Sequence, residues 1–264
     1  MRLTVVGCSG SMSGPGSAAS CYLVQAAGED EDGSPRTWTV VLDLGSGAMG
    51  ALMTHVDPAE IDLLAVSHLH ADHMVDLIGM QVYRRWHPGG PLGPLTVLAP
   101  AGAVDRLRGV GGDGPDEDYA GEFTFREHDP ATPVHVGPLR LEVFPVRHPV
   151  PAYGIRITGP SSLGNGEVSL AYTGDTDSCD GVVALARGVD LLLSEAAFQE
   201  GRDTVRGVHL TGRRAGEVAA AGGAGRLVLT HLQPWTDPEI VRDEAIAVYD
   251  GPVDVAVPGA RWTL

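Results

Sequence analysis

The sequence predicts an α/β fold in which two β-sheets pack face to face and helices cover their outer surfaces. The chain has 264 residues and 43% hydrophobic content, which is enough to bury the core of one domain. Short apolar runs bounded by Gly, Ser or charged residues are typical of buried strands. Such runs come first in each half of the chain and helical patterns follow, which favours sheets flanked by helices.

The first half contains five predicted strands and one clear helix. Strands are expected at residues 3–6, 21–26, 37–42, 61–66 and 95–98. Residues 27–36, A-G-E-D-E-D-G-S-P-R, are expected to form a solvated hairpin turn. Met74, Leu77, Ile78 and Val82 recur at helical spacing and predict a helix over 72–86. The segment 87–121 is rich in Gly and Pro, and outside its strand only a short helix around 104–107 is expected.

The second half repeats the same order of strands followed by helices. Strands are expected at 139–145, 153–158, 168–172, 191–194, 227–229 and 253–257. Helices are expected at about 179–187, 211–221 and 237–248. No stretch has the composition of a linker, so residues 1–264 are expected to form a single domain.

Charge and cysteine content narrow the class of protein. The net charge is -16 and the pI is about 4.8, with 18 basic residues that are all Arg. Such a chain is poorly suited to a nucleic-acid backbone, which requires clustered cations. Cys8, Cys21 and Cys179 are odd in number and far apart, so reduced thiols are expected. The start M-R-L-T-V-V-G is no signal peptide, and no run is long enough to span a membrane, so a cytoplasmic protein is expected.

Residues 67–73, S-H-L-H-A-D-H, crowd four metal-binding side chains behind the apolar run I-D-L-L-A-V. His68 and His70 are two residues apart at a strand end, so their side chains point the same way. Asp72 and His73 fall at the start of the following helix, where a carboxylate suits the positive end of the helix dipole. Isolated loop histidines are ordinary surface residues, but the order H-x-H-x-D-H predicts a metal site.

Three polar residues elsewhere also follow apolar strands and are candidate ligands. They are His148 after L-R-L-E-V-F-P-V-R, Asp175 in L-A-Y-T-G-D-T and His231 at the end of L-V-L-T-H. Each has an ordinary structural explanation, because His148 and His231 can be core histidines and Asp175 a helix N-cap. Their recurrence at strand ends favours a shared site with the histidine cluster.

Together these motifs resemble the metallo-β-lactamase superfamily, and within it the phosphodiesterase and tRNase Z branch. The motifs run from G-C-S-G-S at 7–11 to T-H-L-Q-P-W at 230–235. The resemblance implies an αββα four-layer sandwich of two mixed sheets and two metal ions, usually Zn²⁺, with Mn²⁺ or Fe²⁺ as alternatives. It implies that His68, His70 and His148 hold one metal, that Asp72, His73 and His231 hold the other, and that Asp175 bridges them.

The resemblance also implies a catalytic arrangement. A hydroxide that bridges the two metals would attack a phosphodiester in line with the leaving oxygen, and Asp72 would orient it. Glu195 in L-L-S-E-A-A-F and His209 in V-H-L-T-G match a carboxylate and imidazole pair of the tRNase Z branch. His209 would protonate the leaving group and Glu195 would hold its tautomer. The structural alternatives are a buried hydrogen-bonded acid and a helix-entry histidine.

The departures from tRNase Z point to a small substrate. That family carries a long basic arm before the bridging aspartate, whereas only residues 149–174 separate His148 from Asp175 here. The motifs Y-T-G-D-T, D-L-L-L-S-E-A-A-F and H-L-T-G-R-R-A-G resemble actinobacterial atypical class II cyclic-nucleotide phosphodiesterases. Hydrolysis of 3′,5′-cyclic nucleotides, cyclic AMP foremost, is therefore expected, and nucleic acid and membrane are not expected as partners. A homodimer is expected only by analogy.

Several alternatives stay open at this stage. A tRNase Z-like ribonuclease, a lactone, thioester or β-lactam hydrolase, a catalytically inactive metal protein and a redox di-iron protein would use similar ligands. The Gly and Ser loop at 7–20 can face a phosphate or be a flexible turn. Residues 84–87 can line the substrate pocket or form a basic helix end, and Arg147 and Tyr153 are further pocket candidates. His55, His87, His128 and His135 match no motif and are expected to be surface or structural residues.

Overall fold

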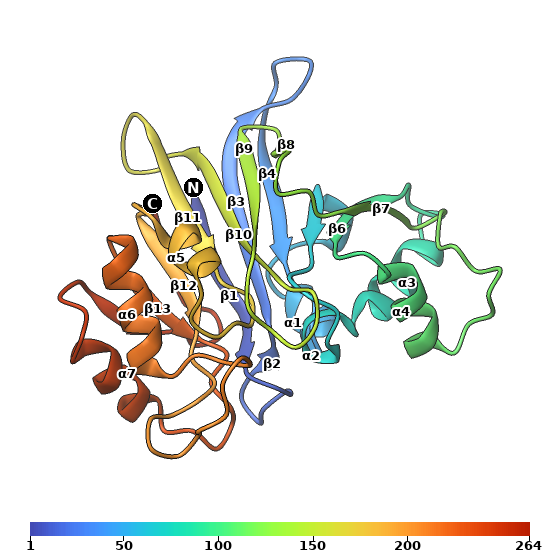
Figure 1. Ribbon diagram of the computed structural model, residues 1–264. Coiled ribbons are helices and arrows are strands. Elements are labelled where there is room, and N and C mark those ends of the chain that lie inside the picture. Colours follow the sequence, from blue (N-terminus) through green and yellow to red (C-terminus); the bar gives the residue numbers. More distant parts are fainter.

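The computed structural model describes residues 1–264, and two mixed β-sheets form its centre (Figure 1). In spatial order, the first sheet consists of β15 (Arg261–Thr263), β1 (Arg2–Ser9), β3 (Cys21–Glu29), β4 (Pro35–Leu42), β5 (Leu63–Ala65), β6 (Leu95–Ala99) and β7 (Phe123–Glu127), and β2 (Ala18–Ala19) pairs with β1. The second sheet consists of β14 (Val253–Val255), β13 (Leu227–Thr230), β12 (Leu191–Glu195), β11 (Glu167–Tyr172), β10 (Tyr153–Pro160), β9 (Leu139–Pro145) and β8 (Val134–Val136).

Each sheet is parallel on one side and antiparallel on the other. Strands β4 to β7 run parallel to one another, and β15, β1, β3 and β4 pair antiparallel. In the second sheet β11 to β14 run parallel, and β8 to β11 pair antiparallel. The carboxyl ends of parallel strands meet at one edge of a sheet, which is where loops gather into a site.

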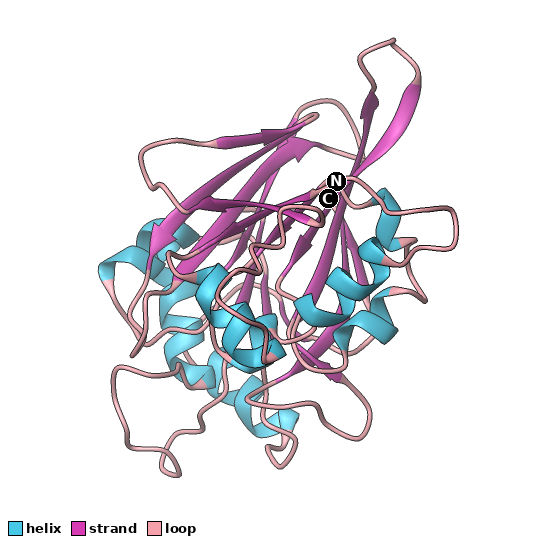
Figure 2. Ribbon diagram, turned by 90° about the vertical axis from the view of Figure 1, so that its right-hand side faces the viewer, coloured by secondary structure: helices cyan, strands magenta, loops and turns pink.

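Helices cover both outer faces and complete a four-layer arrangement (Figures 1 and 2). The first sheet carries α1 (Ala48–Leu52), the 3₁₀ turn η1 (Pro58–Glu60), α2 (Ala71–Met74), α3 (Leu77–Arg85) and α4 (Ala103–Gly111). The second sheet carries α5 (Asp180–Ala186), α6 (Gly212–Gly222) and α7 (Pro238–Ile246). No helix is both long and apolar enough to cross a membrane.

Side chains that point alternately to the two faces of each strand form three apolar layers. In β12, Leu191 and Leu193 face the core between the sheets, whereas Leu192 packs under the helices. In β5, Leu63 faces the same core and Leu64 packs under the helices of the other sheet. Successive side chains of a strand point to opposite faces, so strands buried on both faces appear in the sequence as continuous apolar runs.

The predicted α/β fold of two packed sheets with outer helices is confirmed, with corrections at individual elements. The single helix expected over 72–86 is wrong, because the chain breaks between α2 and α3. The Asp76 amide donates to the carbonyl of Leu44, and the Asp76 carboxylate accepts the amide of Met49. These contacts with α1 and the end of β4 draw residue 76 away from a continuous helix. The strands β2, β7, β8 and β15 and the helix α1 were not predicted.

Candidate active site

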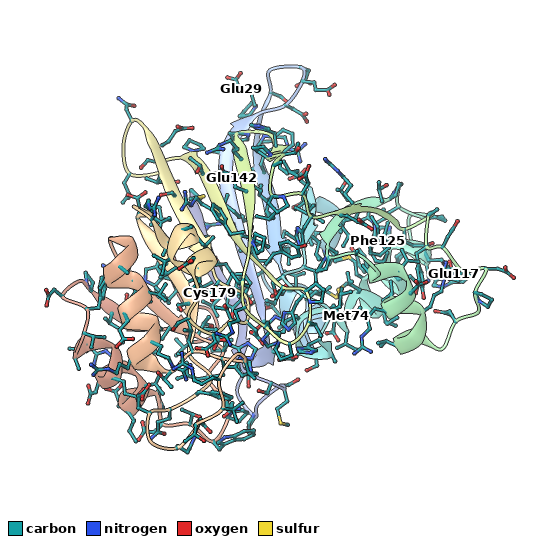
Figure 3. The ribbon with its side chains drawn as sticks, in the orientation of Figure 1. Glu29, Met74, Glu117, Phe125, Glu142 and Cys179 are labelled. Carbon is teal, nitrogen blue, oxygen red and sulfur yellow. The ribbon has the colours of Figure 1, made fainter.

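The candidate active site lies where strands of both sheets end at the same edge of the sandwich. Figure 3 shows Met74 and Cys179, which lie near this edge, far from Glu29 at the opposite end of β3. The sequence places a polar side chain at or just after the carboxyl end of six strands. These are Asp43 after β4, His68 after β5, His148 after β9, Asp175 after β11, Glu195 at the end of β12 and His231 after β13.

Three imidazoles, His68, His70 and His148, converge on one point. The Nδ1 of His70 lies 2.9 Å from His68 Nε2 and 3.1 Å from His148 Nε2. His148 is held in place because its Nδ1 donates to the carbonyl of Val208 at 2.8 Å. Burial lowers the pKa of all three imidazoles, which favours neutral rings. Neutral imidazoles with convergent nitrogens are the ligand type of Zn²⁺ and related divalent metals.

A second group joins Asp72 and His73 of α2 to Asp175 and His231. Asp175 Oδ1 lies 3.2 Å from His73 Nε2 and 3.1 Å from His231 Nδ1. Asp72 Oδ2 lies 3.5 Å from His73 Nε2. The other oxygen of Asp175, Oδ2, lies 3.7 Å from His68 Nε2. Asp175 therefore stands between the two groups with one oxygen toward each.

Two buried atoms at the centre of this group have no hydrogen-bond partner, namely His73 Nε2 and Asp175 Oδ1. Burial would raise the pKa of Asp175, but the charges of His231 and His73 lower it well below its usual value. An orphaned carboxylate oxygen and an orphaned imidazole nitrogen at 3.2 Å are costly in a buried site unless a cation fills it. The residues present thus fit a divalent metal ion in each group.

Asp43 supports this site and was not predicted. Its Oδ2 accepts hydrogen bonds from His73 Nδ1 at 2.7 Å and from the Tyr172 hydroxyl at 2.7 Å. The Ser67 amide donates to Oδ1 at 2.6 Å, and the Ser67 hydroxyl donates to Oδ2 at 2.8 Å. A carboxylate on the far nitrogen of a metal-ligating histidine fixes its tautomer and orientation. The signal in the sequence was an aspartate directly after the apolar strand T-V-V-L.

Backbone strain is concentrated around the same edge. Asp43 and His231 each follow a buried strand and have positive φ angles of 59° and 58°, and Ser11 has a φ of 63°. Residues other than Gly rarely adopt this left-handed conformation, and it persists where the surroundings fix it. Gly10 lies so close that an added Cβ would be 2.0 Å from the carbonyl oxygen of His231.

The Gly and Ser loop contacts a ligand candidate. The Ser11 amide donates to His231 Nε2 at 3.0 Å, and Ser20 Oγ lies 3.2 Å from His231 Nδ1. His231 Nε2 also lies 3.5 Å from Asp72 Oδ2, and Nδ1 lies 3.1 Å from Asp175 Oδ1. The loop therefore supports His231 through Ser11, and this amide points at the imidazole.

Glu195 and His209, which the resemblance implies as a pair, are joined by a hydrogen bond. His209 Nδ1 donates to Glu195 Oε1 at 3.0 Å, and Glu195 also accepts the amides of Thr176 and Ala197. Burial alone would lower the pKa of His209, but the charge and hydrogen bond of Glu195, together with the charge of Asp175, raise it to about 9. The ring centroid of His209 lies 5.5 Å from that of His148. A protonated imidazole therefore stands beside the metal-ligand candidates.

A second supporting carboxylate, Asp177, was also missed. It is fully buried, and it accepts the Gly207 amide at 2.7 Å and Arg206 Nε at 2.8 Å. It also accepts a hydrogen bond from Arg214 of α6. Asp177 thus ties the segment that leads into His209 to the loop of Asp175. The signal in the sequence was the second aspartate of T-G-D-T-D.

Arg84 and Arg85 do not join the site and form the basic end of α3, which is one of the two alternatives that the sequence left open for them. Arg84 is buried and bonds to the carbonyl of Gly93, and Arg85 pairs with Glu117 and Glu122. These partners belong to the segment 87–122, so both arginines fix that segment onto α3.

The remaining pocket candidates and the buried histidine His128 lie outside the two metal-ligand groups. Trp86 is 74% exposed, and the ring of Tyr153 packs on that of His128 at 4.6 Å. His128 is buried and donates to the carbonyl of Val66, and is thus the structural histidine expected. Arg147 is exposed beside His148, with its guanidinium near Gly207.

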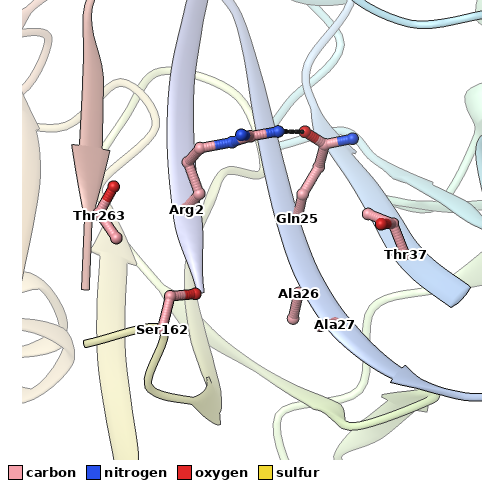
Figure 4. A pocket seen from close by; sticks show the side chains of 7 residues that line it. All are labelled: Arg2, Gln25, Ala26, Ala27, Thr37, Ser162 and Thr263. Atoms are coloured by element: carbon pink, nitrogen blue, oxygen red, sulfur yellow. Dashed lines mark hydrogen bonds between the residues drawn. The ribbon is translucent and has the colours of Figure 1, made fainter. Parts of the chain in front are cut away.

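A hollow at the opposite end of the first sheet offers no comparable chemistry. It lies between the start of β1, the end of β15, the second half of β3 and the start of β4. Figure 4 shows the hydrogen bond from Arg2 to Gln25 Oε1, whose length is 2.6 Å. Its seven lining residues include no histidine, cysteine or carboxylate. The acid, base and ligand chemistry of the chain is therefore gathered at the other edge.

Known proteins share the sequence pattern and the fold of this chain. Residues 39–232 match the family described as "Beta-lactamase superfamily domain". Protein Rv1339 of Mycobacterium tuberculosis is 43% identical over 259 residues, covering 97% of this chain and 90% of the relative. Ribonuclease Z of Methanopyrus kandleri is 28% identical over 247 residues, covering 80% of this chain and 82% of the relative.

One relative also has a solved structure. YhfI of Bacillus subtilis, named a probable metallo-hydrolase, is 28% identical over 268 residues, covering 99% of both chains. Its crystal structure matches with a TM-score of 0.84 at 26% identity, covering 99% of this chain and 98% of that chain. The likeness therefore extends over the whole length of both chains.

Proposed function

The chain belongs to the β-lactamase superfamily and is a metal-dependent hydrolase with the metallo-β-lactamase fold, and from this membership we propose that it hydrolyses a small phosphodiester. The most fitting substrates are 3′,5′-cyclic nucleotides such as cyclic AMP. The observation that carries the proposal is the joint presence of two metal-ligand groups and a buried Glu195–His209 pair. Ester hydrolysis at phosphorus needs both charge neutralisation and a proton for the leaving alkoxide.

We infer that two metal ions bind at the two groups. One ion would be held by His68, His70 and His148. The other ion would be held by Asp72, His73 and His231, and Asp175 would contact both ions. Nitrogen and oxygen ligands suit Zn²⁺, and Mn²⁺ and Fe²⁺ are alternatives. Bound metals of this kind supply Lewis acidity and lower the pKa of water.

The protein's own residues would orient the substrate and deliver the proton. His209 is a protonated donor held at Nδ1 by Glu195, so its Nε2 proton is the one free to reach a leaving oxygen. Glu195 is fixed by two backbone amides and keeps this tautomer. Asp72 lies in the first turn of α2, and 13% of its side chain is exposed. It would orient the nucleophile and accept its proton.

A small substrate fits the chain better than RNA does. The segment between His148 and Asp175 consists of β10, β11 and their connecting turn, and no basic arm extends from it. The chain carries a net charge of -16, and contacts with phosphates dominate RNA affinity. A relative is named ribonuclease Z, so RNA cleavage is the alternative to be tested.

The deciding experiment is turnover by the purified protein loaded with Zn²⁺ or Mn²⁺. Cyclic AMP, bis(4-nitrophenyl) phosphate, a precursor tRNA and a simple lactone would be assayed in parallel. The proposal expects hydrolysis of both phosphodiesters and none of the lactone. Activity on the precursor tRNA without cyclic AMP turnover would favour the ribonuclease alternative. Activity on the lactone alone would contradict phosphodiester hydrolysis.

A further inference from the structure

A pocket of about 380 Å³ opens beside the exposed side of His70. Ligand pockets in proteins occupy roughly 300–1,000 Å³, so this one has room for one compact group. It lies between the loop that follows β6 and the loop that follows β9. Since His70 is a proposed metal ligand, a molecule whose phosphate binds at the metals would place its neighbouring group here.

The walls of this pocket, which we call the His70 pocket, are mostly apolar and rigid. None of its seven lining residues is acidic, although the chain carries a net charge of -16. Proline rings present flat apolar faces and lose little entropy when a ligand packs on them. The apolar lining residues are Leu69, Pro100, Ala101, Val150 and Pro151.

Arg106 of α4 supplies the one cation of the pocket. Its Nε donates to the carbonyl of Leu69 at 3.1 Å, which fixes the guanidinium next to the peptide that leads into His70. It forms no ion pair with any carboxylate, unlike Arg108 in the same helix, which pairs with Asp105. Its terminal nitrogens have no protein partner, so they are free to meet a ligand. A planar guanidinium stacks on aromatic rings and donates to acceptors on the edges of bases.

We propose that the His70 pocket takes the nucleobase of the substrate, and this inference rests on the proposed function. Flat apolar walls with a guanidinium match a planar heterocycle that carries hydrogen-bond acceptors. The absence of a carboxylate argues against a cationic or amine-rich group. The base would sit at the His70 end of the site, and His209 stands beyond His148 at the other end.

The test compares two ligands that differ only by the base. Adenosine 5′-monophosphate and ribose 5-phosphate would be titrated calorimetrically into the Mn²⁺-loaded protein, so the measurement needs no turnover. We expect the nucleotide to bind at least about fivefold more tightly, because that is the lower end of what stacking of one base contributes. Equal affinities would overturn the proposal.

Two variants assign the preference to the His70 pocket. Ala101 is exposed, so Ala101→Trp fills the pocket without disturbing the core, and the nucleotide is expected to lose its advantage over ribose 5-phosphate. Ala131→Trp, at an exposed position outside the pocket, is the matched control and should keep the advantage. A nucleotide preference retained in Ala101→Trp would show that the base binds elsewhere.

Arg106→Ala gives an independent measure and decides the matter if Ala101→Trp loses metal or unfolds. Nucleotide affinity should fall about two- to fivefold, as expected for an exposed guanidinium on a ring, with ribose 5-phosphate affinity and metal content unchanged. Arg126→Ala is the control, because Arg126 is also exposed and lines a neighbouring hollow but not the His70 pocket. An unchanged nucleotide preference in Arg106→Ala would contradict the role of the guanidinium.

Cyclic AMP turnover in the same preparation reports separately on the proposed function. Base-dependent binding without turnover of cyclic AMP would contradict the proposed substrate and leave the pocket assignment intact. Turnover of cyclic AMP with equal affinity for the two ligands would contradict the pocket assignment and leave the proposed substrate intact.

Discussion

Replacing Asp43 by Asn should lower the affinity of the site for metal even though Asp43 is not itself a ligand candidate. The Asp43 carboxylate is fully buried, and its two oxygens accept four hydrogen bonds. Asn has nearly the same shape, but one of its two terminal atoms is a donor. Whichever way the amide turns, that donor faces a hydrogen-bond donor of the protein.

The two orientations of the side-chain amide in the Asp43→Asn variant differ in cost. If the amide nitrogen takes the place of Oδ1, it opposes the Ser67 amide, which is buried and cannot rotate. An unsatisfied buried amide costs about 1–3 kcal/mol. If the nitrogen takes the place of Oδ2, the Ser67 and Tyr172 hydroxyls can rotate, and His73 must accept at Nδ1. The proton of His73 then moves to Nε2, which is the nitrogen that faces Asp175.

The second orientation is the less costly one, and it blocks the nitrogen that a metal requires. Loss of such a supporting carboxylate typically lowers metal affinity about 10–100-fold. The measurement is a competition titration of Zn²⁺ against a fluorescent chelator, with the free energy of unfolding of the apo protein measured by urea denaturation. Asp43→Asn should lose affinity by this factor.

Two controls make the result interpretable. Tyr172→Phe removes one hydrogen bond from Asp43 and leaves its charge and its bond to His73, so metal affinity should change by less than about threefold. Asp62→Asn disturbs a carboxylate that pairs with Arg36 away from the site and tests the effect of general destabilisation. Wild-type metal affinity in Asp43→Asn would refute the argument that Asp43 fixes the tautomer of His73.

Three further predictions follow from the site and the core. Asp175→Ala should release metal and abolish turnover, and a metal-replete, active variant would contradict the bridging role. His209→Ala should keep its metal content but lose rate, more on cyclic AMP than on bis(4-nitrophenyl) phosphate, whose leaving group needs no proton; equal losses would contradict the acid role. Burial lowers the pKa of His128 to about 4, so the folded state favours the neutral ring, and stability present above about pH 6.5 is lost as the pH falls toward 4. The free energy of unfolding would be measured by urea denaturation across this pH range. As the pH falls, this free energy should decrease by about 3 kcal/mol less in His128→Asn than in wild type. His135→Asn, at an exposed position, should follow wild type.

The location of the site was predictable because strand ends are visible in the sequence. Polar side chains after apolar runs mark the carboxyl ends of strands, and His68, His148, Asp175 and His231 all follow this pattern. Parallel strands bring such ends to one edge of a sheet, which places Asp175 and His231 together. His148 joins them because β9 and β11 are both antiparallel to β10 and so run in the same direction. Asp43 follows the same pattern and was missed, because one aspartate after a strand resembles an ordinary turn residue.

The sequence by itself predicted the two-sheet fold, because hydrophobic alternation is a local property of a chain. The resemblance of its motifs to a known family implied the ligand set and the Glu195–His209 pair. Only the tertiary structure decided the rest. It placed Asp43 behind His73, tied Asp177 to the segment that carries His209, broke the helix at Asp76, and left Arg106 without an ion pair beside His70. Each of these features depends on contacts between residues far apart in the chain. Spacing and periodicity within one segment carry no information about such contacts until the two sheets have packed.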